Sequence, residues 1–278
     1  MVEYSKKLRV ILPLLYTYDF GAPVWRMRLD AAANRLALEV RDADLLLADF
    51  YTLELTHNKL KKLPLPGAKN WWLGLEDVHE GLLLLHSYGD RQTGQHKGIM
   101  AYTAEEGKLQ WQQPELAFYG VSADGILALD LQDQKLYLLD SQTGTILSEN
   151  VSLVGGANSV AEYNIERTKA CVYPMLFLEG EPYFTQVQDF LEHQLQVKPV
   201  KGIEYAETEQ YILVSFYTET ADGKLDNLLS VFDLNGELQL RQRIAHGLSG
   251  IGSDTFIIFN HNLYFIQQRN ILVVYSLS

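Results

Sequence analysis

The residues best suited to chemistry lie in one long polar segment. "HSYGDRQTGQHKG", residues 86–98, contains His86, Asp90, Arg91 and His96. Imidazoles and a carboxylate are the groups that bind transition metals or transfer protons near neutral pH. The same glycines and polar residues are what a solvated loop between two strands needs. The segment therefore predicts either a metal or proton-transfer site, or an ordinary polar loop.

A second candidate set consists of glutamates that recur at matching places in the sequence. It comprises Glu76, Glu162 and Glu204, with Arg28 at the corresponding place in another segment. Three carboxylates that converge near a guanidinium could bind a cation or a polyhydroxylated ligand, and their repulsion could raise the pKa of one of them. The alternative is that they are solvated at the ends of short strands and paired with Arg28.

Aromatic residues at the starts of predicted strands form a third set, which contains Trp71, Trp72 and Tyr119. Successive residues of a strand point to opposite faces, so at most one of Trp71 and Trp72 can be a stacking platform for a ligand. The alternative is that these rings pack in the core, where aromatic side chains bury large areas.

Charge and cysteine content exclude several classes of function. The 278 residues carry a formal net charge of -12, which repels nucleic acid and anionic membrane surfaces. Cys171 is the only cysteine, so an internal disulfide and a cysteine-based zinc cluster are excluded. We expect a protein or small-molecule partner, no nucleic acid and no cofactor.

The N-terminal segment "KKLRVILPLLYTYDFGAP" has the rough outline of a signal peptide. Its uninterrupted apolar run, Val10 to Leu15, is short, and no later segment approaches the roughly 18 apolar residues that a membrane helix needs. We therefore expect no membrane insertion and a cytoplasmic protein, with export as the alternative.

The elements that would position these residues are predicted by an internal repeat. "GIMAYTAEEGKLQWQQ" and "KLYLLDSQTGTILSEN" share an apolar run, a polar turn ending in glycine and an alternating run, and "LLSVFDLNGELQLRQRI" repeats the pattern. A second short pattern precedes each copy of the repeat. Its six versions align at Arg28, Glu76, Ser122, Glu162, Glu204 and Gly252, which are separated by 48, 46, 40, 42 and 48 residues. These lengths are typical of four strands and their turns in a propeller blade.

The repeat predicts an all-β fold, a single β-propeller over residues 1–278 with six four-stranded blades, or seven as the alternative. The C-terminal "ILVVYSLS" supplies half a unit, and "SKKLRVILPLL" near the N-terminus reads as a strand without a blade of its own. We expect this N-terminal strand to complete the last blade and close the ring. Residues 181–195 show partial helical periodicity, but their place in the repeat predicts strands.

The two clearest repeats, "GIMAYTAEEGKLQWQ" and "KLYLLDSQTGTILSE", resemble those of quinoprotein-like and WD-like propellers. That resemblance implies a quinone-dependent alcohol or sugar dehydrogenase. Enzymes of that family often use a vicinal cysteine pair, which a chain with Cys171 alone does not have. An uncharacterised bacterial propeller family is another resemblance. The expected function is a non-enzymatic platform for protein or ligand binding, because no catalytic motif is present. The alternative is a metal-assisted hydrolase or lactonase acting at the mouth of the propeller channel.

Overall fold

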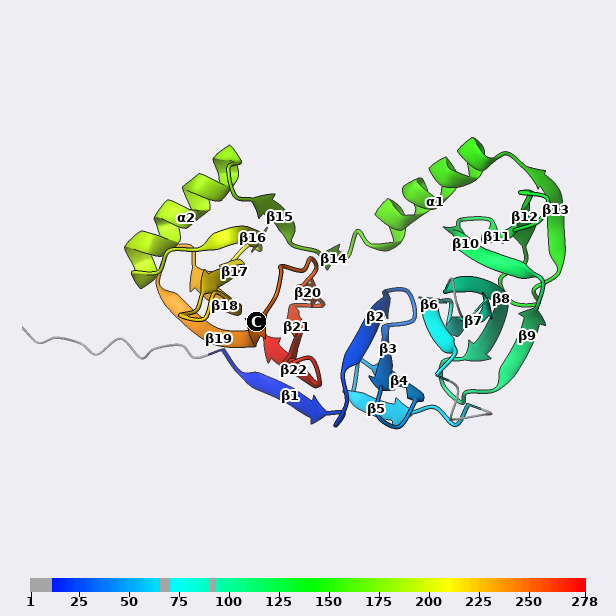
Figure 1. Ribbon diagram of the computed structural model, residues 1–278, viewed down its shortest axis with the longest axis horizontal. Coiled ribbons are helices and arrows are strands. Elements are labelled where there is room, and N and C mark those ends of the chain that lie inside the picture. Colours follow the sequence, from blue (N-terminus) through cyan, green and yellow to red (C-terminus); the bar gives the residue numbers. More distant parts are fainter. Residues whose placement is uncertain (1–11, 66–70, 91–93) are drawn as a thin grey trace, which may run out of the picture. The chain divides into compact units, whose positions relative to one another are not determined.

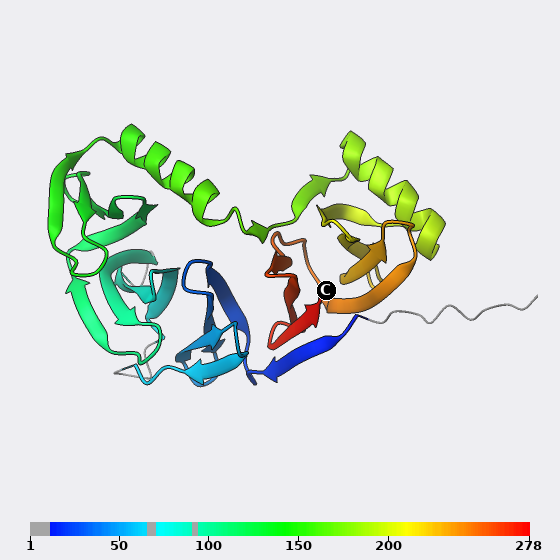
Figure 2. The same cartoon turned by 180° about the vertical axis from the view of Figure 1, so that it is seen from behind.

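The computed structural model describes residues 12–65, 71–90 and 94–278. The chain divides into two compact units, which we name for their place in the sequence. The middle unit is Ala22–Ala170, and the terminal unit combines Met1–Gly21 with Cys171–Ser278 (Figures 1 and 2). The single domain expected over residues 1–278 stays a prediction.

The middle unit contains three sheets, each built from four strands that follow one another in the sequence and pair antiparallel with their neighbours. Their apolar residues alternate or run continuously, as sheets packed against other sheets require. The strands are β2 (Val24–Asp30), β3 (Arg35–Asp42), β4 (Leu47–Glu54), β5 (Lys59–Lys62), β6 (Leu73–His79), β7 (Leu82–Asp90), β8 (Gln95–Thr103), β9 (Leu109–Gln113), β10 (Leu116–Ser122), β11 (Gly125–Asp130), β12 (Leu136–Leu139) and β13 (Ile146–Val151).

The terminal unit contains two sheets of five strands. One runs in sequence order through β15 (Met175–Leu178), β16 (Val200–Glu207), β17 (Tyr211–Glu219), β18 (Leu225–Asp233) and β19 (Leu238–Leu248). The other has the order β1-β22-β21-β20-β14, with β1 (Leu14–Asp19), β14 (Cys171–Val172), β20 (Phe256–Phe259), β21 (Asn262–Gln267) and β22 (Ile271–Ser276). A core shared by the two sheets includes Leu12, Leu213, Val231 and Phe256.

The predicted pairing of the N-terminal strand with the last sheet is confirmed. β1 runs antiparallel to β22, with Leu14 opposite Tyr275 and Asp19 opposite Ile271. Phe20 also donates a backbone hydrogen bond to Asn270. β1 begins at Leu14, and residues 5–11 of the expected segment lie outside the described residues.

The expected fourth blade is wrong, because its segment forms two helices, α1 (Leu153–Arg167) and α2 (Pro182–Leu195). The Ser152 side chain caps α1 by accepting from the amide of Gly155, and Pro182 occupies the first turn of α2, where a missing N–H costs nothing. α2 packs on β15 and β16 through Phe184 and Leu191 (Figure 1). Neither described helix is long and apolar enough to cross a membrane.

The all-β propeller class is confirmed by these sheets, since consecutive antiparallel strands that form four-stranded sheets are the blades of a propeller. Among the described residues there are five sheets, where the repeat predicted six blades. The difference comes from residues 153–195, which form two helices and add two short strands, β14 and β15, to the sheets of the terminal unit.

Candidate metal-binding site

Three side chains of the middle unit bring potential metal ligands together. Glu76, His86 and His96 each offer one ligand atom, and these atoms all lie within 4.8 Å of one another. Oε1 of Glu76 lies 2.7 Å from Nδ1 of His86 and 2.7 Å from Nδ1 of His96. The two imidazoles are stacked, with ring centroids 3.5 Å apart and an angle of 12° between the planes.

The strands β6, β7 and β8 place these side chains through irregular pairing. Glu76 is the extra residue of a bulge in β6, between Leu75 and Asp77, which pair with consecutive residues of β7. A second irregularity leaves Gly98 of β8 unpaired, and its φ of +83° is one that glycine adopts without strain. Bulges of this kind redirect side chains, and they are frequent next to functional sites.

Gly74 makes room for the imidazole of His86, which lies opposite it on the neighbouring strand. A Cβ atom at position 74 would lie 2.4 Å from Cε1 and 2.6 Å from Nε2 of His86. Such contacts are far shorter than the usual carbon–carbon separation. The absence of a side chain at Gly74 is therefore a requirement of this site.

Burial and charge favour the protonation states that metal binding needs. The side chain of His86 is 1% exposed, and its burial lowers its pKa. Burial alone would raise the pKa of Glu76, but the nearby His86 and His96 outweigh it and lower that pKa. The result is a carboxylate beside a neutral imidazole, which are the forms that coordinate metals.

His86 is unusual because it is buried with an unpaired ring nitrogen. Its Nδ1 lies 2.7 Å from Oε1 of Glu76, whereas its Nε2 has no hydrogen-bond partner among the described residues. An unsatisfied buried polar group costs about 1–3 kcal/mol. A ligand that bonded to the ring would remove this cost.

Two arginines of β2 contact the chain around Glu76. Nη1 of Arg26 lies 3.4 Å from Oε2 of Glu76 and donates to the carbonyl of Leu75 at 2.5 Å. Arg28 was predicted to pair with the glutamates, and its Nε donates instead to the backbone carbonyl of Glu76 at 3.1 Å. The guanidinium beside the Glu76 carboxylate is therefore that of Arg26.

A buried ion pair holds the backbone that carries Glu76. Glu39 and Arg41 of β3 pair with each other, and both are almost fully buried. Arg41 donates to the carbonyls of Trp71 and Leu73 at 2.5 Å each, and Oε2 of Glu39 accepts from the amide of Leu75 at 2.6 Å. These hydrogen bonds hold the backbone at Trp71, Leu73 and Leu75, the alternate residues that precede Glu76.

The aromatic candidates lie around this site in different ways. Trp71 is half-buried and contacts the Arg41 guanidinium, which lies 5.1 Å from its ring centroid. Trp72 is 36% exposed and meets Tyr88 edge to face at 5.7 Å. Tyr88 in turn contacts both imidazole rings, at 5.0 Å for His86 and 5.2 Å for His96. Trp72 and Tyr88 thus form an aromatic border to the site.

The remaining candidates are not part of the Glu76 cluster as it is described. The prediction that Glu162 lies on a strand is wrong, because Glu162 is exposed on α1. Tyr119 is half-buried at a bulge of β10, and Asp90 ends β7. Arg91 lies outside the described residues.

Glu204 belongs to the terminal unit, and its convergence with Glu76 stays a prediction. Its carboxylate is fully buried on β16, where Oε2 accepts from the amide and hydroxyl of Thr255. Oε1 has no hydrogen-bond partner among the described residues. Burial is the main cause that raises the pKa of this carboxyl.

Sequence reasoning missed Arg26, Glu39 and Arg41, although a signal for them was present. Glu39 and Arg41 are two residues apart in "RLALEVRD" and follow its apolar residues Leu36 to Leu38, so both side chains point to one face of a buried strand. Opposite charges at such positions indicate a buried pair. Arg26 likewise shares a face with Arg28 across one residue.

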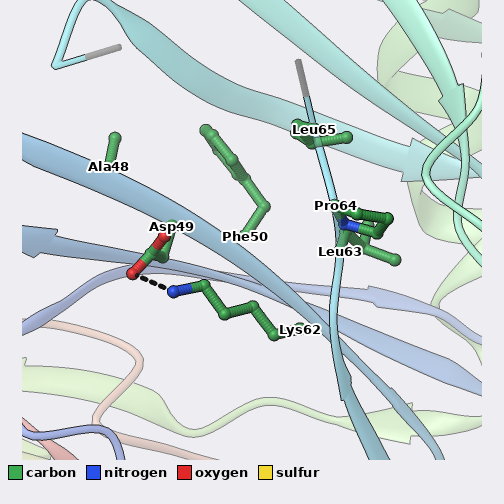
Figure 3. Close-up of a pocket in the computed structure, with 7 residues that line it drawn as sticks. All are labelled: Ala48, Asp49, Phe50, Lys62, Leu63, Pro64 and Leu65. Atoms are coloured by element: carbon green, nitrogen blue, oxygen red, sulfur yellow. Dashed lines mark hydrogen bonds and ion pairs between the residues drawn. The ribbon is translucent and has the colours of Figure 1, made fainter. Parts of the chain in front are cut away.

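A separate hollow of the same unit lies between β4 and the residues after β5 (Figure 3). Its volume is about 240 Å³, and Phe50, Leu63 and Pro64 contribute to its apolar lining. Figure 3 shows its charged residues paired, with Nζ of Lys62 2.7 Å from Oδ2 of Asp49. The two charges compensate each other, and this hollow lacks the imidazoles of the Glu76 cluster.

Comparison with known proteins finds a family model for part of the chain and assigns no function to it. A family model described as "Domain of unknown function (DUF4905)" matches residues 29–111, which include all three residues of the cluster. No curated protein matches the chain.

Two solved propellers are similar to the chain at low identity. The β-propeller domain of the Trilobed protease from Pyrococcus furiosus is 11% identical with a TM-score of 0.34, and the match covers 87% of this chain and 62% of that one. The Dos1 propeller is 9% identical with a TM-score of 0.36, over 93% of this chain and 73% of that one. Because both TM-scores are below 0.5, the assignment of the fold rests on the strand pairing. The predicted quinoprotein-like or WD-like character of the repeats stays a prediction.

Proposed function

We propose that the chain is a ligand-binding propeller whose ligand is a divalent transition-metal ion held by Glu76, His86 and His96. The observation that carries the proposal is that three ligand atoms lie within 4.8 Å of one another and that Nε2 of the buried His86 has no hydrogen-bond partner among the described residues. Of the two binding roles that the sequence predicts, this favours a ligand over a protein partner as the first function to test.

The chemistry of the three groups selects the class of metal. Two imidazoles and a carboxylate are ligands for Zn²⁺ and for neighbouring transition metals, whereas Ca²⁺ and Mg²⁺ prefer oxygen ligands alone. Glu76 Oε1 is now at hydrogen-bond distance from Nδ1 of both rings. The metal would therefore compete with protons for these atoms, and its affinity would fall as the pH is lowered.

Isothermal titration of the metal-free protein with Zn²⁺ tests the proposal. We expect one site per chain, with at least 100-fold weaker affinity in Glu76→Gln and His96→Ala. His57→Ala is the matched control, because the side chain of His57 is 79% exposed and pairs with Glu54 outside the cluster. Zinc binding that is equally strong in the Glu76 and His96 variants, or no binding by the unmodified chain, would overturn the proposal.

A second candidate function is metal-assisted hydrolysis, the alternative that the sequence predicts. It is favoured by the number of ligands, because catalytic zinc sites have three protein ligands and one position for water or substrate. The side chain of His96 is 33% exposed, so solvent reaches the cluster from its side. Zinc-loaded protein should then hydrolyse simple lactones, and Glu76→Gln should not. Zinc binding without any turnover would leave the binding function and remove the hydrolase.

A further inference from the structure

The terminal unit contains a larger cavity, with a volume of about 700 Å³. It lies between α2 and the edge formed by β15, β16 and the start of β17. Small-molecule sites commonly have volumes of about 300–1,000 Å³ and apolar linings with few polar groups. The size fits one small molecule and is independent of the metal site, which belongs to the other unit.

Aromatic rings dominate the lining of this cavity. They are contributed by Tyr173, Phe177, Tyr183, Phe190 and Tyr205. Phe177 and Tyr183 are stacked with centroids 5.3 Å apart, although Tyr183 is 62% exposed. The faces of aromatic rings carry partial negative charge, so they attract cations as well as apolar groups.

The charged group at the cavity is a carboxylate. Among the described residues that line it, Glu207 is the only charged one. Its Oε2 accepts a hydrogen bond from the Tyr205 hydroxyl at 2.8 Å. Burial, together with this carboxylate, raises the pKa of Tyr205 to about 12, so the hydroxyl stays protonated and remains a donor.

We infer that this cavity binds a small organic cation, an amine or quaternary ammonium compound with an apolar body. The aromatic rings would surround the body of the ligand, and Glu207 would face its charged group. A neutral apolar ligand would leave the carboxylate unused, and an anion would be repelled by it. Aromatic rings combined with a carboxylate are the groups that recognise organic ammonium ions.

Three probes with the same phenylbutyl body test this inference on the full chain: 4-phenylbutylamine, 4-phenylbutanol and 5-phenylpentanoate. Isothermal titration should show the amine binding at least tenfold more tightly than the alcohol, and no binding of the carboxylate. Equal affinity for the amine and the alcohol, or no binding of the amine at millimolar concentration, would overturn the inference.

Variants separate the charge from the aromatic lining. Glu207→Gln keeps an acceptor for the Tyr205 hydroxyl and should reduce the amine to the affinity of the alcohol. Glu209→Gln is the matched control, because Glu209 is exposed two residues away and does not line the cavity. Tyr183→Ala removes an exposed ring and should weaken the amine and the alcohol alike. An amine affinity that Glu207→Gln leaves unchanged would show that this carboxylate does not select the ligand.

Discussion

Glu76 and Glu204 occupy the same place in their strands and have opposite chemistry. Each lies three residues before the end of its strand, since β6 ends at His79 and β16 ends at Glu207. Glu76 is surrounded by two imidazoles and the guanidinium of Arg26, and its pKa is lowered. Glu204 is fully buried against hydroxyl groups, and its pKa is raised. The position in a repeat therefore does not decide the chemistry of a residue; its neighbours do.

The difference between the neighbours starts from strand pairing. Glu76 is the extra residue of a bulge, and the opposite strand presents His86 across from Gly74. Glu204 pairs regularly with Ser215, whose hydroxyl belongs to a chain of hydrogen bonds that includes Thr255 and Asn227. One inserted residue and one missing side chain thus convert a buried carboxylate into a potential metal ligand.

The largest expected effect separates the units that hold the two glutamates. Leu12 is 2% exposed in the core of the terminal unit, so Leu12→Ala should lower the free energy of unfolding by about 3 kcal/mol. Zinc affinity at Glu76 should not change, because Leu12 belongs to the unit without this site. Chemical denaturation and zinc titration measure the two quantities.

Leu14→Ala is the control for that experiment, because Leu14 lies in the same segment but is 54% exposed. Its effect on unfolding should be below about 0.5 kcal/mol. Equal destabilisation by the two substitutions would contradict the burial of Leu12 and with it the anchoring of the N-terminal segment in this core.

A smaller effect is expected from Gly74→Ala, which places a methyl group against the buried His86 imidazole. Displacing this ring should cost about 2 kcal/mol in unfolding free energy and weaken zinc binding at least tenfold. Gly250→Ala is the control: no atom lies within 4 Å of its added methyl group, and its backbone is outside the left-handed region. Unchanged zinc affinity in Gly74→Ala would show that the position of His86 does not matter for binding.

The fold could be predicted from the sequence wherever the signal was local and repeated. The strands around "GIMAYTAEEGKLQWQQ" and "KLYLLDSQTGTILSEN" are confirmed, as is the pairing of the N-terminal strand with the last sheet. The prediction of a blade over residues 153–195 was wrong. It rested on their length, which matches one repeat, although Ser152 and Pro182 mark helix starts. Spacing identifies a unit of sequence, whereas capping and apolar periodicity decide its structure.

The site could be predicted only in part, because its members came from two separate hypotheses. His86 and His96 were recognised as one candidate and Glu76 as another, and the structure joins them. Their meeting depends on a bulge at Glu76 and on the unpaired Gly98, which no alternation pattern reveals. The ion pair of Glu39 and Arg41, which holds the backbone near Glu76, could have been predicted from the sequence. Opposite charges on one face of a buried strand are expected to pair with each other.

The smallest expected effect tests the comparison of the two glutamates directly, through the pH dependence of unfolding in chelator. The lowered pKa of Glu76 means that its contribution to stability is complete above pH 4.5 and is lost as the pH falls through its folded-state value. Glu76→Gln should therefore be less stable than the unmodified chain at neutral pH, by about 1 kcal/mol. The difference should disappear at acid pH.

Glu204 should give the opposite sign. Because its pKa is raised, the folded state holds a proton that the unfolded state has released, and stability falls as the pH rises from 4.5 through the folded-state value. Glu204→Gln should match the unmodified chain at acid pH and be more stable, by about 1 kcal/mol, at neutral pH. Glu209→Gln, at an exposed position, should change neither profile. If both glutamine variants shifted stability in the same direction with pH, the two carboxylates would share one environment, and the contrast drawn from their neighbours would be wrong.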